Sequence, residues 1–213
     1  FWLVRLPQDL DLRAAALVEP VAVAVHDVHR ARVPAGDRVV VIGGGPIGLL
    51  IAISARERGA EVLLSEVTTS RLELAVRLGF RAADPNRDDL DAMVLKWTGD
   101  AGADIAFEVS GSVPGDKAMT DVLRRRGRGV IVGIQPKAPP VDVFQVFWKE
   151  LEIIGARVYE RSDFEEAVRL VAEGTIPTEE LIGDVVPLKD TAAAVERLDS
   201  GENVVKVLIA SAG

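Results

Sequence analysis

The segment RVVVIGGGPIGLL at residues 38–50 constrains the fold of this chain more than any other. Its apolar run stops at a glycine-rich turn, where Gly43, Gly45 and Gly48 form a G-x-G-x-x-G pattern between a predicted strand and a predicted helix. Pro46 suits the first turn of that helix, because a first-turn residue needs no N–H and benefits from a fixed φ. The glycines would permit a tight turn, close approach of a pyrophosphate, and close packing of helix on strand. The pattern therefore predicts a dinucleotide site at the start of the helix.

A carboxylate follows the glycine-rich turn at a suitable distance. The predicted strand at 61–66 ends in Glu66, 18 positions after Gly48 (66 minus 48), near the roughly 20 expected for an acid that binds the adenosine ribose. Such a carboxylate accepts hydrogen bonds from ribose hydroxyls and repels the extra phosphate of NADP, so it favours NAD. A glycine-rich turn alone can be purely structural, and the flanking strand, helix and acid favour the cofactor over that alternative.

The composition is that of a globular protein with one substantial core: 213 residues, 48% of them hydrophobic. No apolar run approaches the roughly 20 residues that span a bilayer, and the N-terminal sequence lacks signal-peptide features, so we expect a cytoplasmic protein without a membrane partner. The net charge of −8 argues against a nucleic-acid partner. The dense basic run RRRGR at 124–128 is expected to form a solvated helix end. The absence of cysteine excludes disulfides and thiolate metal ligands from this chain.

Apolar strands alternate with amphipathic helices through the middle of the chain, which predicts a parallel sheet covered on both faces. The expected fold class is α/β, a Rossmann doubly wound six-stranded sheet with strand order 3-2-1-4-5-6. Its ligand should bind beyond the strand ends at Gly43, Glu66, Gly111 and Gly133, where the order reverses. After the helix that follows the glycine-rich turn, further helices are expected over 69–78, 87–97, 115–124 and 163–173. Strands after the one at 61–66 are expected over 80–83, 103–109, 129–134 and 151–156.

Both ends of the chain fall outside this alternation. A long apolar helix interrupted by Pro20 is predicted over 12–32, and a strand, helix and strand are predicted over 184–210. These flanks look like pieces of a second module whose main body lies elsewhere. The predicted division has three parts: a linker helix with a remnant of that module at 1–32, a dinucleotide-binding domain at 33–174, and a return into the module at 175–213.

Several blocks of the chain resemble a known family. They are ALVEPVAVAVHDV at 16–28, PAGDRVVVIGGGPIGLL at 34–50, FEVSGS at 107–112, DFEEAVRLVAEG at 163–174 and KVLIA at 206–210. Their order is similar to that of the zinc-dependent alcohol dehydrogenases of the medium-chain dehydrogenase/reductase superfamily, and Glu19-Pro20 indicates its polyol, butanediol and threonine dehydrogenase branch. Such enzymes carry a preceding GroES-like catalytic domain with a Cys and a His-Glu pair for zinc. The resemblance implies that this chain is the cofactor-binding part plus the C-terminal return, without that N-terminal domain.

The resemblance also implies roles for particular residues in cofactor binding. It places Gly43, Gly45, Pro46, Ile47 and Gly48 at the pyrophosphate, Glu66 at the ribose, Arg71 beside the adenine, and Ser110, Gly111, Gly133 and Ile134 along the crevice near adenosine and nicotinamide. Arg71 could instead be an exposed helix charge, and the last four could be ordinary strand-end residues.

Glu19 and two histidines are the candidates for a metal. The resemblance implies that Glu19 supplies a carboxylate to the catalytic zinc, directly or through its water, although a helix carboxylate can also cap or pair. Zinc takes four ligands, so Glu19 would be one of several, and zinc is expected only in the complete enzyme. His26 and His29 share a helix face, but no third ligand converges on them by sequence, so packing or surface roles are expected for both.

The activity implied by the resemblance is oxidation of a secondary alcohol or polyol, with zinc polarising the substrate oxygen while hydride passes to NAD. The chain as given, without the zinc ligands, should be inactive. Two alternatives remain: a stand-alone NAD(H)-binding module without catalysis, and a zinc-free quinone or enoyl reductase, a branch that usually prefers NADP. Glu66 and Glu19-Pro20 count against the second. The family joins subunits at the sheet edge that corresponds to 141–156, so a homodimer or homotetramer is expected.

Overall fold

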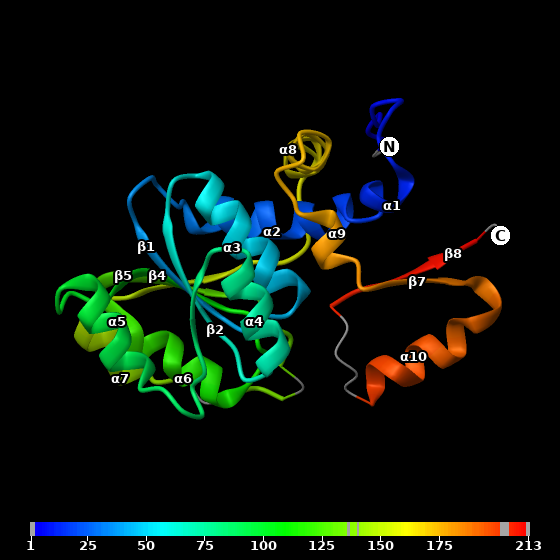
Figure 1. Cartoon of the computed structure of the whole chain (residues 1–213). Coiled ribbons are helices and arrows are strands. Elements are labelled where there is room, and N and C mark those ends of the chain that lie inside the picture. Colours follow the sequence, from blue (N-terminus) through cyan, green and yellow to red (C-terminus); the bar gives the residue numbers. More distant parts are fainter. Residues whose placement is uncertain (1–2, 136, 140, 201–204, 212–213) are drawn as a thin grey trace.

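The structure is a computed structural model that describes residues 3–135, 137–139, 141–200 and 205–211. Its main sheet is parallel and six-stranded with the order β3-β2-β1-β4-β5-β6, which confirms the predicted topology (Figure 1). The strands of this sheet are β1 (Arg38–Ile42), β2 (Glu61–Ser65), β3 (Arg81–Ala83), β4 (Ala103–Glu108), β5 (Leu123–Ile131) and β6 (Glu152–Gly155). The α-helices are α1 (Leu12–Ala15), α2 (Val18–Ala31), α3 (Pro46–Glu57), α4 (Thr69–Arg77), α5 (Leu90–Thr98), α6 (Val113–Val122), α7 (Val143–Lys149), α8 (Arg161–Ala172), α9 (Thr178–Leu181) and α10 (Thr191–Asp199).

Helices cover both faces of the sheet, as the apolar strands predicted. Alternate residues of β1 show the two sides: Val39 and Val41 belong to the core under α2, α3 and α8, whereas Val40 and Ile42 belong to the core under α5 and α6. Both cores are closely packed, and the β1 valines are fully buried. The reversal of strand order between β1 and β4 opens a crevice at their carboxyl ends, which is where the glycine-rich turn lies.

Helix α2 packs against α3 and α8 and contributes much of the larger core. The predicted helix over 12–32 is broken, but not at Pro20 as expected. The break lies between α1 and α2, at residues 16–17, and Pro20 occupies the first turn of α2, where its missing N–H would have no helical partner. The domain boundary at residue 32 remains a prediction.

We predicted that the basic run at 124–128 forms a helix end. Instead it lies within β5. Helix α6 ends before it, at Val122. Arg128 donates hydrogen bonds to Asp37 Oδ2 (3.0 Å) and to the carbonyl oxygen of Ala31 (2.6 Å). These acceptors are distant in sequence, so local charge patterning could not indicate them.

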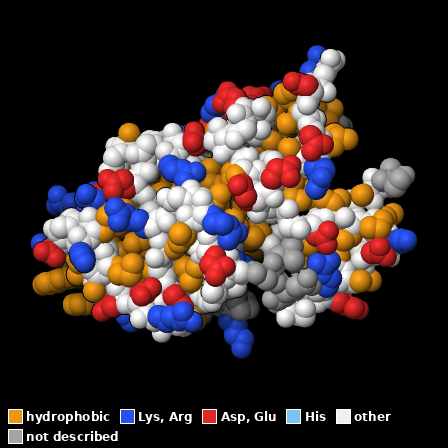
Figure 2. Space-filling view, viewed as in Figure 1, with side chains coloured by type: hydrophobic (Ala, Val, Ile, Leu, Met, Phe, Trp, Pro, Cys, Tyr) orange, Lys and Arg blue, Asp and Glu red, His pale blue; other side chains and the backbone are white. Residues whose placement is uncertain are grey.

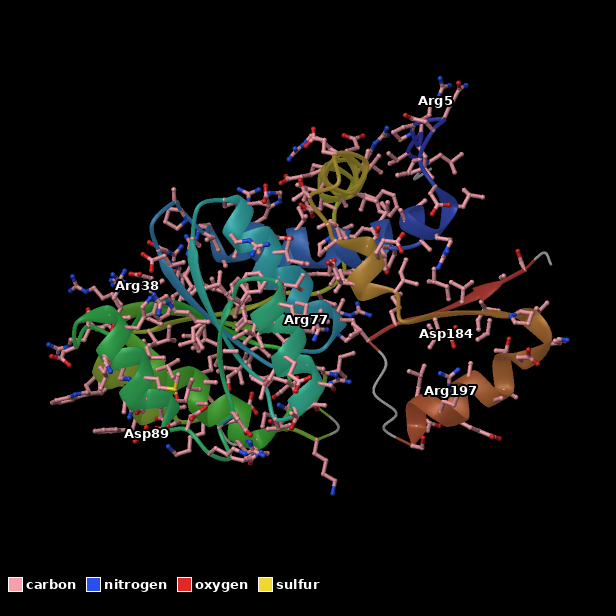
Figure 3. The ribbon with its side chains drawn as sticks, viewed as in Figure 1. Arg5, Arg38, Arg77, Asp89, Asp184 and Arg197 are labelled. Atoms are coloured by element: carbon pink, nitrogen blue, oxygen red, sulfur yellow. The ribbon has the colours of Figure 1, made fainter. Side chains whose placement is uncertain are left out.

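The C-terminal part forms a second, two-stranded parallel sheet of β7 (Asp184–Pro187) and β8 (Val207–Ala210), beside the main body in Figure 1. A 3-10 turn (Leu188–Asp190) leads from β7 into α10. Arg197 of α10 reaches back to Asp184 of β7, with Nη1 2.9 Å from Oδ2 (Figure 3). This strand, helix and strand match the predicted elements at 184–210. Among the described residues, no helix is both long and apolar enough to cross a bilayer.

Candidate cofactor-binding site

A cavity of about 390 Å³ lies at the carboxyl ends of β1, β2 and β4. Five of the predicted site residues line it: Gly43, Gly45, Glu66, Arg71 and Ser110. The cavity has an apolar side formed by Pro85, Leu90, Pro114 and Ala118, which the sequence analysis did not identify. Its position, at the reversal of strand order, is where a doubly wound sheet binds its ligand.

Each glycine of the G-x-G-x-x-G turn has its own structural reason. Gly43 has a φ of +107°, and a Cβ there would lie 2.9 Å from the backbone nitrogen of Ser110. A Cβ at Gly48 would overlap the carbonyl oxygen of Gly43, so α3 packs closely on β1 because this position has no side chain. A Cβ at Gly45 would meet nothing closer than the Arg71 guanidinium, at 3.9 Å. Gly45 therefore leaves bare backbone facing the cavity, the kind of cradle that a pyrophosphate fits.

Pro46 and Ile47 form the first turn of α3 beside this cradle. Pro46 occupies the first helical position, as predicted. Ile47 is half-buried and packs against the larger core, which fixes the start of the helix relative to the sheet. The free N–H groups at this end of α3 and the positive end of its dipole favour an anion there.

Glu66 lies one residue beyond β2, and its side chain is only 5% exposed. Its Oε2 accepts a hydrogen bond from the backbone N–H of Gly44 (2.7 Å), and its Oε1 accepts from Val67 and Thr68 (2.8 Å each). A carboxylate has about four acceptor positions, so these three bonds leave about one for a ribose hydroxyl. Glu66 therefore joins the turn after β1 to the turn after β2 as well as facing the cavity.

Arg71 extends from α4 toward the same carboxylate, with Nη1 3.8 Å from Glu66 Oε2. Its side chain is 36% exposed, so both interpretations of this residue describe it in part: the guanidinium is a helix charge partly open to solvent and also lines the cavity.

The predicted residues after β4 and β5 divide into two groups. Ser110 lines the cavity, whereas Gly111 and Gly133 lie against each other, so closely that a Cβ at Gly133 would overlap Gly111 N. Ile134 is 93% exposed and does not line the cavity. Behind these residues lies Glu108, a fully buried acid that the sequence analysis missed. The one local signal for it is an acid at the end of an apolar strand, directly before Val109, Ser110 and Gly111.

Comparisons with known proteins match this geometry. The family model of the zinc-binding dehydrogenases matches residues 46–173. The chain belongs to the zinc-binding dehydrogenase family. This membership confirms the resemblance to zinc-type alcohol dehydrogenases of the medium-chain superfamily.

One curated relative, the 2-dehydro-3-deoxy-L-galactonate 5-dehydrogenase of Pseudoalteromonas atlantica, is 49% identical over 205 residues, covering 96% of this chain and 60% of the relative. The crystal structure of 2R,3R-butanediol dehydrogenase from Bacillus subtilis is 31% identical with a TM-score of 0.91, covering 98% of this chain and 60% of that one. A protein of Sinorhizobium meliloti assigned to the zinc-binding dehydrogenases, solved with bound NADP, is 28% identical with a TM-score of 0.88, covering 97% and 61%. The chain thus spans about 60% of the length of the relatives it matches.

The described residues do not fit a zinc site of their own. Glu19 is exposed in the first turn of α2. Within the described ranges, no group of three or more His, Cys, Asp or Glu side chains is arranged to hold a metal ion. The zinc role of Glu19 therefore remains a proposal that needs ligands from other residues.

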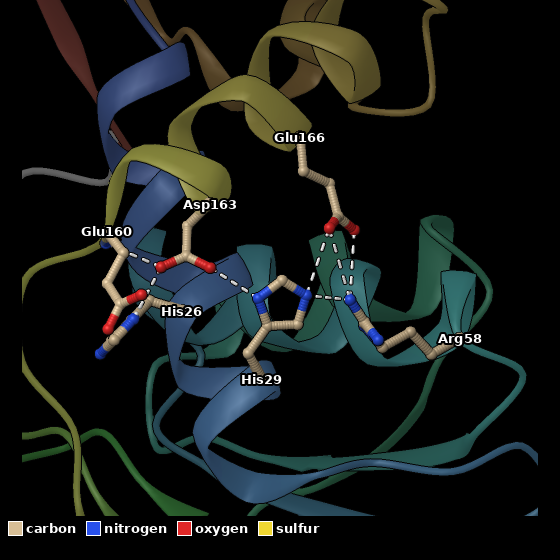
Figure 4. A network of polar contacts seen from close by, with 6 residues as sticks. All are labelled: His26, His29, Arg58, Glu160, Asp163 and Glu166. Carbon is tan, nitrogen blue, oxygen red and sulfur yellow. Dashed lines mark hydrogen bonds and ion pairs between the residues drawn. The ribbon is translucent and has the colours of Figure 1, made fainter. Parts of the chain in front are cut away.

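His26 and His29 take part in a polar network between α2 and α8 (Figure 4). His26 Nδ1 lies 2.7 Å from Asp163 Oδ2, and His29 Nδ1 lies 2.6 Å from Asp163 Oδ1. On its other side, His29 Nε2 contacts Arg58 and Glu166, with Glu166 Oε2 at 3.2 Å. An open cavity of about 360 Å³ adjoins the network. Both histidines join helices by hydrogen bonds, as the packing interpretation expected.

Proposed function

We propose that this chain binds NAD(H) and forms the cofactor-binding part of a dehydrogenase that oxidises a secondary alcohol or polyol by hydride transfer to NAD. The observation that carries the proposal is the cavity at the strand reversal, which is lined by the bare backbone of Gly45 and by Glu66. The relatives named for butanediol and a deoxy sugar acid support the substrate class. Hydride transfer is the chemistry that the nicotinamide supplies when bound; this chain's residues would bind and orient it.

The preference for NAD over NADP rests on Glu66. Its carboxylate is nearly buried and has about one acceptor position left for a ribose hydroxyl, and a 2′-phosphate at that place would meet like charge. Arg71 is the group that would offset this repulsion, but it lies against Glu66. A related protein is solved with NADP, so cofactor choice needs a direct measurement.

Titration of the purified 213-residue chain with NADH and NADPH, followed by nicotinamide fluorescence, tests the proposal. We expect NADH to bind at least about tenfold more tightly, a difference of about 1.4 kcal/mol. Equal or tighter binding of NADPH would contradict the NAD preference. Failure to bind either cofactor would contradict cofactor binding itself.

The same chain should not turn over alcohols. A panel of secondary alcohols and polyols, offered with NAD and added zinc, should give no sustained formation of NADH. Sustained turnover would contradict the proposal that Glu19 needs zinc ligands from outside this chain. The full-length protein should turn over a member of the panel. If it binds NADH but oxidises no alcohol, the stand-alone NAD(H)-binding module is favoured. If it reduces a quinone or enoyl substrate with NADPH, the zinc-free reductase is favoured.

We propose further that the protein assembles as a homodimer, or as a homotetramer built on it, through the sheet edge at 141–156. Strand β6 is the edge strand, and its outer backbone groups can pair with another strand. Beside it, α7 exposes an apolar face; hydrophobic side chains gather at that end of the molecule in Figure 2. Phe147 and Trp148 are 75% and 59% exposed. Sedimentation that finds only monomer at micromolar concentration would contradict this assembly.

A further inference from the structure

Glu108 is the last residue of β4, and its side chain is enclosed at the base of the cofactor crevice. Its Oε1 accepts hydrogen bonds from the Ser110 hydroxyl and from Ser110 N (3.0 Å). The N–H of Gly111 reaches both carboxylate oxygens, at 3.1 and 3.2 Å. Glu108 thus holds the loop after β4 by three donors, much as Glu66 holds the turns after β1 and β2.

The same residue also holds the segment after β5. The backbone oxygen of Glu108 accepts hydrogen bonds from Val132 N and Gly133 N, both at 2.9 Å. A Cβ at Gly133 would lie 2.5 Å from Glu108 Oε2, and a Cβ at Gly115 would lie 2.5 Å from Oε1. Glycines on two different elements therefore make room for one carboxylate. Any movement of this carboxylate must move the loop after β4 or the segment after β5.

Enclosure has an electrostatic cost at this position. Burial raises the pKa of Glu108, and the hydrogen bonds from Ser110 and Gly111 oppose that rise. A buried carboxyl retained at such a cost usually has a structural or functional reason. Here the reason is geometric, because the donors belong to the loops that border the crevice.

The two acids divide the crevice between them. A doubly wound sheet binds a dinucleotide across two halves of its strands, with the acid after the second strand on the adenosine ribose. Glu66 lies in the half of β1, β2 and β3, whereas Glu108 fixes the ends of β4 and β5 in the other half. Ser110 also lines the cavity beside Glu66, so within the second half it is the segment after β5, at Gly133, that faces the nicotinamide end.

We propose that Glu108 is a positioning residue for the cofactor, which acts through Gly111 and Gly133 to hold the nicotinamide half of the crevice in place. This inference rests on the proposed binding of NAD(H). It assigns Glu108 no contact with the cofactor itself.

The test compares NADH with AMP, which probes the adenosine half alone. In Glu108→Gln, the amide NH2 replaces an acceptor and faces N–H donors, so the dissociation constant for NADH should rise about tenfold while that for AMP stays within about twofold. Gly133→Ala leaves the carboxylate intact but places a Cβ against both Glu108 Oε2 and Gly111 N, and should reproduce the same selective loss. The emission maximum of bound NADH should shift in both variants, because the nicotinamide ring is less firmly held.

Glu173→Gln is the matched control, an exposed glutamate at the C-cap of α8 whose described ion pair is with Arg169, and it should leave both dissociation constants unchanged. Glu108→Asp, which keeps the charge but withdraws it from the N–H of Gly111, is a milder variant in case Glu108→Gln does not fold, and should weaken NADH more than AMP. Equal losses for NADH and AMP, or no loss in any variant, would overturn the inference. An unmodified chain that binds no NADH would instead overturn the proposed function.

Discussion

Two regions of the molecule bury carboxylates in different ways. At the cofactor crevice, Glu66 and Glu108 are both buried, and each accepts several hydrogen bonds from backbone N–H groups of the adjoining turns. Between α2 and α8, Asp163 and Asp27 are 3% and 0% exposed. Asp163 accepts three hydrogen bonds, whereas neither oxygen of Asp27 has a partner among the described residues.

The difference shows what the donors do for the fold. Backbone donors from turns tie a crevice carboxylate to the loops that face a ligand, so its burial shapes the site. The donors on Asp163 come from two imidazoles and the start of α8, so its burial joins two helices. Asp27 accepts a hydrogen bond from neither kind of donor among the described residues. Burial, reinforced by the charge of Asp163, therefore raises the pKa of Asp27 to about 7.

Removal of Asp163 should have the largest effect on stability. Burial tends to raise the pKa of Asp163, but the hydrogen bonds from Glu160 N–H and both imidazoles outweigh it and lower that pKa. Asp163→Ala removes all three bonds and should reduce the free energy of unfolding by about 4 kcal/mol at neutral pH. Urea denaturation measures this, with Glu165→Ala, an exposed position on the same helix, as control. A loss no larger than in the control would mean that the network does not join α2 to α8.

The pH dependence of the Asp163 contribution has a definite sign. Because the folded-state pKa is lowered, the stabilisation is present above the unfolded pKa of 3.8 and is lost as the pH falls through the folded pKa. The difference in unfolding free energy between the unmodified chain and Asp163→Ala should therefore shrink on acidification. A difference independent of pH would contradict the assignment.

The contribution of Asp27 to stability should depend on pH with the opposite sign. Its folded-state pKa of about 7 exceeds the unfolded value of 3.8, so the folded chain binds the extra proton and loses stability as the pH rises between those values. The shift of about three units corresponds to about 4 kcal/mol as an upper figure. Asp27→Asn should remove this dependence and make the chain about 2–3 kcal/mol more stable at pH 8. Asp9→Asn, at an exposed position, should change nothing, and a destabilised Asp27→Asn at pH 8 would disprove the unpaired-acid explanation.

Replacement of Glu66 tests the crevice side of the comparison. Glu66→Ser removes the ribose acceptor and should weaken NADH binding by about 1.5–3 kcal/mol, while NADPH is affected less, so that the preference narrows. It also leaves Gly44 N and Val67 N without their acceptor, so the melting temperature should fall. Glu73→Ser, an exposed acid on α4, is the control for both measurements. Unchanged NADH affinity would remove Glu66 from the site.

Much of the fold could be predicted from local sequence, because β1, β2 and β4 are short apolar runs that end at turn signals. The strand order followed from the glycine-rich turn and was confirmed. The prediction that helix α6 extends to residue 124 was wrong, because the arginines of 124–128 are held in β5 by partners such as Asp37 that are distant in sequence. The break near Pro20 was misplaced because a proline is compatible with a first helical turn.

The site was predictable where its chemistry depends on spacing within one segment. The glycine-rich turn and Glu66 belong to one strand, helix and strand, and the fold brings them to one cavity. Pro85 and Leu90 reach that cavity from another loop and helix, and no pattern relates them to the turn. Glu108 and Asp27 were missed for a different reason: an acid has no sequence signature of burial, which depends on the packing of neighbouring elements.

An exposed ion pair at the C-terminal end of α8 gives the smallest expected effect and shows what burial contributes. Arg169 Nη1 and Glu173 Oε2 form an i,i+4 pair at 2.5 Å, with both side chains 54% exposed. Glu173→Gln should change the unfolding free energy by no more than about 0.5 kcal/mol, and less at high salt, because solvent screens the pair. Asp163→Ala on the same helix should cost about eight times as much. If urea denaturation gives similar losses for both, charge pairing alone sets the energy, and the distinction between buried, saturated carboxylates and exposed ones fails.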